Sequence, residues 1–229
     1  ATLDVVRIVT AVGLVLATLV FAATASARDP KDPRQRHTAA ATQLARSIAL
    51  KRSDLATGWK AAPKDNSNAS CSAAPDESNL VQTARIDQSF VRTDGVATVG
   101  SEIDIFSTTA QAKRDWQLST LTVVGKCLLE SARRQLAKQH VTVTIGSADS
   151  LTTPKLGERS LHYRLVFLLS RERAGKREVL PYVTELIGLG IGRTSVVLHA
   201  SSWQPLPSSG LLTLAKTLAK RLVAASGGI

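Results

Sequence analysis

Hydrophobic positions along the chain follow two periods, one of three to four residues and one of two. Apolar residues at helical spacing predict four helices, over about 37–51, 109–121, 124–138 and from 208 onward. Alternating apolar and polar positions predict six strands, two within 81–106 and four between 141 and 203. The expected order is therefore helix, two strands, two helices, four strands, helix.

Short turns between the predicted strands indicate how they pair. Asp94-Gly95 is a hairpin signal between the first two strands. A charged turn around Gly175 and a glycine turn at 190–193 join the later ones. Successive strands joined this way form an antiparallel sheet, and helices before, within and after it favour an α+β fold. We expect an antiparallel sheet flanked by helices on both faces, an α/β/α sandwich.

The first 27 residues have the layout of a secretory leader. An uninterrupted apolar run from Ile8 to Ala23 is followed by the small residues Ala25, Ser26 and Ala27. The run is about 16 residues long, shorter than the roughly 20 that a spanning helix needs, so cleaved export is favoured over a permanent anchor. Residues 1–27 are predicted to be a signal peptide, and membrane anchoring is expected only if the leader is uncleaved.

The next nine residues, 28–36, combine two prolines with six charged side chains. This composition cannot bury apolar surface, so the segment is interpreted as a disordered basic spacer. The remaining residues, 37–229, are enough for one domain with a well-filled core.

Only two cysteines occur, Cys71 and Cys127. In an exported chain an even number of cysteines favours a disulfide, which would tether the loop over 54–76 to the helix that carries Cys127. Two buried thiols are the alternative. A zinc site is disfavoured because neither cysteine has a close-spaced partner.

The chain has a formal net charge of +11. The basic residues are dispersed along it, and no basic motif with interleaved aromatics points to nucleic acid. The charge fits an anionic lipid or wall polymer as a neighbour, or it serves solubility alone.

Sequence motifs for catalysis are missing. The chain contains no G-x-S-x-G, H-E-x-x-H, S-x-x-K or C-x-x-C, and its glycine-rich stretch at 188–192 lacks dinucleotide-binding spacing. The four histidines are isolated from one another in sequence. We therefore expect no catalytic residues, no metal and no cofactor.

Polar residues on two predicted strands are the candidate ligand-binding positions. Glu102 and Asp104 flank a core-facing residue on one strand, and His162 and Arg164 do so on another. Together they are predicted to form one charged sheet face for a small polar ligand, with Trp59 as a wall of the cleft. A solvated face or a set of salt bridges is the alternative, and Trp59 would then cap the edge of the core.

Several spaced segments carry a resemblance to a known family: Asp54–Trp59, Val99–Phe106, Thr109–Ala112, Cys127-Leu128 and Ala219–Leu222. Over about 38–225 the chain resembles the extracellular sensor domains of mycobacterial PknH-type receptor kinases and related actinobacterial secreted proteins. The resemblance implies a PsbP/Mog1-like fold with a cleft and a role in binding or sensing at the cell envelope. The second disulfide of the kinase members has no counterpart here.

These observations lead to an expected function. The chain is interpreted as a non-catalytic, secreted or envelope-associated binding or sensor-like protein with an unidentified small polar ligand or envelope component as partner. A surface module that contacts anionic lipid or wall polymer is the alternative. A secreted hydrolase would require a serine, a histidine and a carboxylate within hydrogen-bond reach.

Overall fold

The computed structural model describes residues 29–63, 71–173, 175–204 and 207–227. It contains eight strands: β1 (Arg34–Gln35), β2 (Trp59–Ala61), β3 (Val81–Arg92), β4 (Ala97–Phe106), β5 (Thr142–Ser150), β6 (Arg159–Arg173), β7 (Lys176–Ile191) and β8 (Thr194–Ser202). Four α-helices accompany them: α2 (Ala39–Ile48), α3 (Thr109–Leu118), α4 (Leu121–Leu136) and α5 (Ser208–Ser226). The leader predicted over 1–27 lies outside the described residues.

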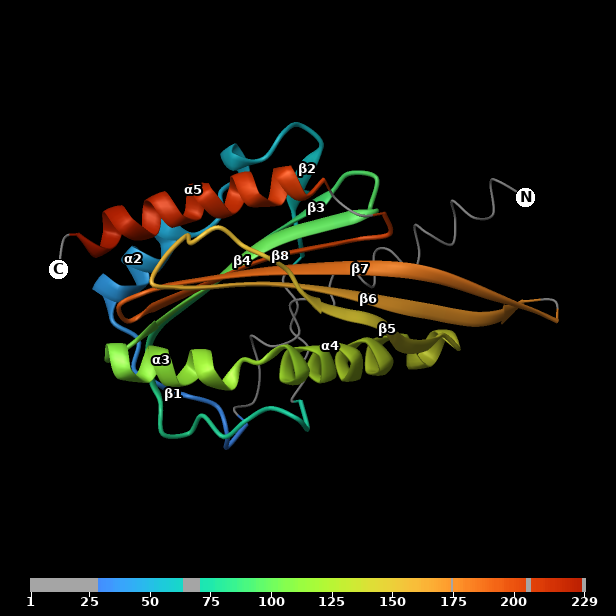
Figure 1. The fold of residues 1–229 in the computed structure, drawn as a ribbon, viewed down its shortest axis with the longest axis horizontal. Helices are drawn as coiled ribbons and strands as arrows, with labels where there is room; N and C mark the ends of the chain where they lie inside the picture. The colour runs from blue at the N-terminus through green and yellow to red at the C-terminus, as the bar shows by residue number, and fades with distance from the viewer. Residues whose placement is uncertain (1–28, 64–70, 174, 205–206, 228–229) are drawn as a thin grey trace.

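The strands form one sheet in the order β1-β3-β4-β8-β7-β6-β5, with β2 paired to β3. All neighbouring strands are antiparallel except β1 and β3, which are parallel. Helices α2 and α5 cover one face, and α3 and α4 cover the other (Figure 1). The predicted α+β sandwich is confirmed. Among the described residues, no helix is long and apolar enough to cross a membrane.

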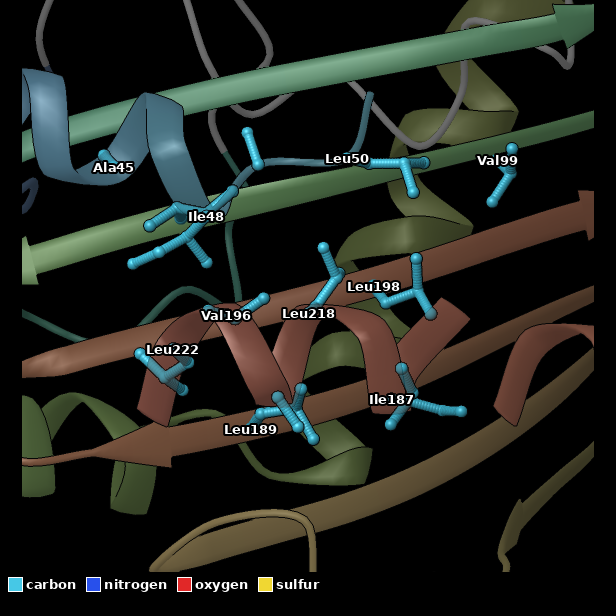
Figure 2. Packing of buried hydrophobic residues seen from close by; sticks show 14 of the residues in the cluster. Ala45, Ile48, Leu50, Val99, Ile187, Leu189, Val196, Leu198, Leu218 and Leu222 are labelled. Carbon is cyan, nitrogen blue, oxygen red and sulfur yellow. The ribbon is translucent and has the colours of Figure 1, made fainter. Parts of the chain in front are cut away.

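Each face of the sheet has its own apolar core. Beneath α2 and α5, completely buried residues such as Ile48, Leu189 and Leu218 interdigitate (Figure 2). Beneath α4, a second core gathers around Leu136 and Leu165 on the β5–β6–β7 half of the sheet. Such burial is the main favourable term in folding. On the β3–β4–β8 half of the α3 face, a smaller buried cluster of Leu80, Phe106 and Ala112 lies beside charged side chains.

Hydroxyl caps set where α3 and α4 begin. Thr108 accepts a hydrogen bond from the Gln111 amide, and Thr120 accepts one from the Val123 amide. Since a cap supplies a partner for an otherwise unpaired amide, α4 starts at Leu121, three residues earlier than the apolar spacing indicates. In α5 the N-cap position is occupied by Pro207, which supplies no side-chain cap.

The prediction of a disordered spacer over 28–36 is wrong for residues 34–36. The Arg34 amide donates to the Leu80 carbonyl at 2.8 Å, and the Arg36 amide donates to the Gln82 carbonyl at 2.8 Å. Composition predicts that a segment lacks a core of its own, but it does not show that another strand has a free edge. Backbone pairing with β3 supplies the order that the side chains cannot.

An ion pair ties α5 to the segment that follows α2. Arg221 donates to both carboxylate oxygens of Asp54, at 2.6 and 2.8 Å, and to the Ala49 carbonyl at 3.1 Å. Burial would raise the pKa of Asp54, but the contacts with Arg221 and Lys51 outweigh it and hold that pKa below its usual value.

Loss of this ion pair should be measurable. Arg221→Ala is expected to lower the free energy of unfolding by about 2 kcal/mol, because it leaves the half-buried Asp54 carboxylate without its charged donor. Urea unfolding at neutral pH measures the change. Lys220→Ala, an exposed neighbour on the same helix, is the matched control. Equal effects of the two variants would contradict the assignment.

Candidate functional site

The four charged residues predicted to share one sheet face lie on opposite faces. Glu102 pairs with Val197, Val197 with Gly188, and Gly188 with Leu161. Residues opposite each other in an antiparallel ladder project from the same face. Glu102 therefore shares its face with Leu161 and not with His162, and the prediction of a single charged face is wrong.

Strand register is the physical reason for this correction. Alternation within β4 and within β6 fixes which residues of each strand point the same way. It does not fix the relation between two strands that are separated by β8 and β7, where a shift of one residue exchanges the faces. As a result Glu102 and Asp104 face α3, whereas His162 and Arg164 face the side of α2 and α5.

His162 and Arg164 meet at Glu185 of β7. His162 Nε2 lies 3.2 Å from one Glu185 oxygen, and Arg164 Nη2 lies 2.7 Å from the other. Glu185 and His162 are each 4% exposed. This is a buried ion-pair network. His162 Nδ1 has no hydrogen-bond partner among the described residues, so no serine hydroxyl extends the carboxylate–histidine pair.

Glu185 was not among the residues predicted from the sequence. The residue interrupts the apolar run of β7 between Thr184 and Leu186, and a carboxylate inside a buried strand indicates a charged partner. Trp59, by contrast, lies in β2 and packs against the edge of the core beneath α2 and α5. It does not join either group of charged residues.

A layer of charged side chains fills the space between α3 and the β3–β4 hairpin. Arg85 Nη2 lies 2.7 Å from Glu102, its Nε lies 3.5 Å from Asp87, and its Nη1 lies 3.8 Å from Asp104. Gln82 donates to Asp104 at 2.6 Å. One guanidinium is therefore shared by three carboxyl groups from two adjacent strands.

Two more carboxyl groups close this charged layer. Glu77 comes from the segment before β3, where its backbone amide donates to the Lys31 carbonyl at 2.7 Å, and Asp115 comes from α3. Burial and the proximity of the two carboxylates to each other raise the pKa of Glu77 to about 7. Burial and Glu102 raise the pKa of Asp115 to about 7.

The carboxyl groups on the strands differ in how readily they hold a proton, because their pKa values are shifted in different directions. Burial raises the pKa of Asp104 well above its usual range, and its hydrogen bond to Glu102 adds to the shift. Burial and Glu102 raise the pKa of Asp87 to about 7. Burial alone would raise the pKa of Glu102 as well, but Arg85 outweighs it and keeps this pKa low. Glu102 is thus the carboxylate that stays charged.

His199 of β8 borders the same layer. Its ring packs where a side chain at Gly100 would stand, so the glycine permits the close approach. Burial lowers the pKa of His199 to about 4, although Glu102 opposes the shift. The imidazole is therefore neutral near pH 7. Among the described residues, no group of three or more His, Cys, Asp or Glu side chains could hold a metal ion.

Beside this layer, a cleft of about 380 Å³ opens at the junction of α3 and α4. Its lining comes from this junction, from the end of β5 with the residues after it, and from β6. Six hydroxyl-bearing residues contribute to it: Ser119, Thr120, Ser150, Thr153, Ser160 and Tyr163. The rings of Trp116 and Tyr163 supply aromatic surface. No lysine, arginine or carboxylate residue lines the part of this cleft that the structure describes.

Trp116 joins the cleft to the charged layer. A Cβ at Gly188 would come within 2.8 Å of its ring, so the tryptophan occupies a slot that only a glycine leaves open. The Arg159 guanidinium lies 5.8 Å from the ring centroid, within the range of a cation–π contact. Asp115, the preceding residue of α3, is one of the carboxyl groups of the layer. A shift of α3 would therefore change the cleft and the layer together.

The cleft could not be recognised in the sequence because each of its residues is of an ordinary type for its position. Serines and threonines near helix ends and strand ends usually serve as caps or solvated positions. These serines and threonines come together only when the α3–α4 junction packs against β5 and β6. A stretch rich in hydroxyl residues, 147–153, was the one available signal.

Comparison with known proteins adds a partial structural match. No family model and no curated protein matches the chain. Among solved structures, the chain is similar to the extracellular domain of PknH from Mycobacterium tuberculosis, with 10% sequence identity and a TM-score of 0.34. The match covers 62% of this chain and 66% of that structure. At this level of similarity no residue role is transferred, and the site rests on its own geometry.

Proposed function

We propose that this chain is a non-catalytic binding protein whose cleft at the α3–α4 junction takes a small, uncharged ligand rich in hydroxyl groups. The observation that carries the proposal is the lining of the cleft, with hydroxyl side chains beside the rings of Trp116 and Tyr163. Hydroxyl groups both donate and accept hydrogen bonds, so they match a ligand of the same kind. Aromatic faces match the apolar C–H surfaces of a sugar ring.

Size and charge support a small neutral ligand. A cleft of about 380 Å³ is at the lower end of the range for small-molecule sites. An ionised ligand would need a charged partner, and the described lining holds no lysine, arginine or carboxylate; its one histidine, His162, is already paired with Glu185. The buried His162–Glu185 pair has no hydroxyl nucleophile at His162 Nδ1 there, which supports binding over acyl transfer.

An extracytoplasmic location is part of the proposal. Cys71 and Cys127 form a disulfide in the structure, with their Cα atoms 5.2 Å apart, and disulfides persist mainly in oxidising compartments. The apolar leader over 1–27 supports the same location. The ligand class is accordingly an exogenous or envelope-derived saccharide or polyol.

Titration of the full chain with neutral sugars tests the proposal. We expect N-acetylglucosamine, trehalose or mannitol at millimolar concentration to shift the backbone amide NMR signals of residues 116–120 and 150–153. Ser119→Ala combined with Ser150→Ala should weaken binding by about tenfold, the effect expected for one to two lost hydrogen bonds. Thr144→Ala, an exposed hydroxyl of β5 outside the cleft, is the matched control.

Two outcomes would overturn the proposal. One is that none of the sugars shifts signals at the cleft. The other is that only anionic vesicles bind and that about 0.5 M salt abolishes this binding, because salt screens exposed charges. The second outcome would favour a surface module that contacts anionic lipid or wall polymer.

A further inference from the structure

The charged layer beneath α3 contains more negative groups than positive ones. Five carboxyl groups, from Glu77, Asp87, Glu102, Asp104 and Asp115, interact with the Arg85 guanidinium, and Asp115 also interacts with Arg159. The side chains of Asp87, Glu102 and Asp104 are only 12–25% exposed. Uncompensated charges in such a place are costly, so the excess carboxyl groups must hold protons or separate.

The surrounding elements do not remove this imbalance. Asp32, in the segment before β1, adds negative charge next to Glu77. Glu158 lies 3.6 Å from Arg159 and takes up part of its charge. His199, the ionisable residue that β8 presents to the layer, is neutral near pH 7 because its pKa is about 4. Arg85 is therefore the principal cation for all five carboxyl groups.

A buried hydroxyl group on the same face is also unsatisfied. Ser195 of β8 stands directly opposite Asp104 in the sheet and is 5% exposed. Its Oγ has no hydrogen-bond partner among the described residues. A hydroxyl group without a hydrogen-bond partner among the described residues therefore lies next to carboxyl groups that can gain or lose protons.

We propose that this charged layer is a proton-dependent latch for α3: with protons on its excess carboxyl groups α3 stays seated on the sheet, and without them α3 loosens together with its wall of the cleft. The latch acts on the ligand-binding function proposed above and so rests on it. The coupling element is the last turn of α3, which presents Asp115 to the layer and Trp116 to the cleft. Loss of protons therefore weakens ligand binding.

The titration range supports a response near neutral pH. Burial, with neighbouring carboxylates, raises the pKa values of Glu77, Asp87 and Asp115 to about 7. Below that pH the three groups are mostly neutral and their repulsion is small. Above it, Asp115 becomes a carboxylate facing the charged Glu102, and only Arg85 and Arg159 offset the repulsion.

Fluorescence of Trp116 tests the latch without any ligand. The full chain with Trp59→Phe and Trp203→Phe keeps Trp116 as its single tryptophan. Acrylamide quenching of this residue is expected to increase about twofold or more between about pH 5.5 and about pH 8.5 as α3 loosens. Adding Asp115→Asn should keep quenching low at both values, because the amide is neutral throughout. Asp149→Asn, an exposed carboxylate of β5, should keep the pH response and is the control.

A second variant keeps the latch testable if Asp115→Asn does not fold. Asp87→Asn should also reduce the pH response, since it removes another carboxyl group of the layer. Quenching that does not depend on pH in the parent chain, or the same pH response with and without Asp115→Asn, would overturn the latch. Trehalose binding separates the two proposals. If quenching of Trp116 depends on pH but no sugar binds, the proposed function is rejected. If the sugar binds equally well at both pH values and quenching of Trp116 is constant, the latch is rejected.

Discussion

Cys71→Ala combined with Cys127→Ala is expected to lower the free energy of unfolding by about 4 kcal/mol. The disulfide closes a loop between residues 56 positions apart, and the chain-entropy model assigns about this value to a loop of that length. For a domain of this size the melting temperature should fall by roughly 10 °C. Differential scanning calorimetry of the variant and the parent measures the change.

Contacts near the disulfide define its local effect. The Ser72 amide and hydroxyl donate to Glu130 at 2.9 and 2.8 Å, one turn of α4 beyond Cys127. The same segment then leads to Glu77 of the charged layer. Hydrogen exchange should therefore increase over residues 71–80 in the variant. A melting temperature unchanged by the double substitution would show that these contacts hold the segment without the disulfide. Ser78→Ala, in the same segment, is a control that keeps the disulfide.

The pairing within the charged layer could have been read from the sequence. A two-residue turn at Asp94-Gly95 places Arg85 opposite Asp104 and Asp87 opposite Glu102, which is the register observed. The alternation of Arg85 and Asp87 with apolar neighbours also puts both on the face of the acidic pair. A local turn fixes register because few residues separate the paired positions.

The relation between β4 and β6 had no such local signal. β8 and β7 lie between them in the sheet, and the pairing of β4 with β8 joins residues almost a hundred positions apart in sequence. A one-residue change in that register would have placed His162 and Glu102 on one face. Periodicity therefore predicted the strands and the sandwich but not which charged residues meet. The cleft could not be predicted for the same reason, since it depends on how α3 and α4 pack across the sheet.

The carboxyl groups of the layer make a prediction for stability as a function of pH. Glu77, Asp87 and Asp115 have pKa values of about 7 in the folded protein, against ordinary values of 4.5 for Glu and 3.8 for Asp. Between pH 4 and 7 the folded state therefore binds more protons than the unfolded state. Their stabilising contribution is complete below pH 4, decreases as the pH rises, and is gone above pH 7.

His199 acts in the opposite direction. Its pKa is about 4 when folded and 6.5 when unfolded, so its contribution is complete above pH 6.5 and is lost as the pH falls toward 4. Asp104, whose pKa is also raised well above its ordinary value, acts in the same direction as the three carboxyl groups, and together they outweigh one imidazole. After allowing for solvent screening, we expect the free energy of unfolding to fall by roughly 3 kcal/mol from about pH 5 to about pH 8.

Urea unfolding across this range measures the dependence, and Asp115→Asn identifies its source. The variant should lose about a third of the contribution of these three carboxyl groups if they contribute equally, because the amide carries no proton to lose. Asp149→Asn should leave the curve unchanged, since that carboxylate is exposed on β5. A protein more stable at pH 8 than at pH 5 would mean that the carboxyl groups are ionised and compensated in the folded state. The charged layer would then be a static ion-pair network that could not hold α3 in a proton-dependent way.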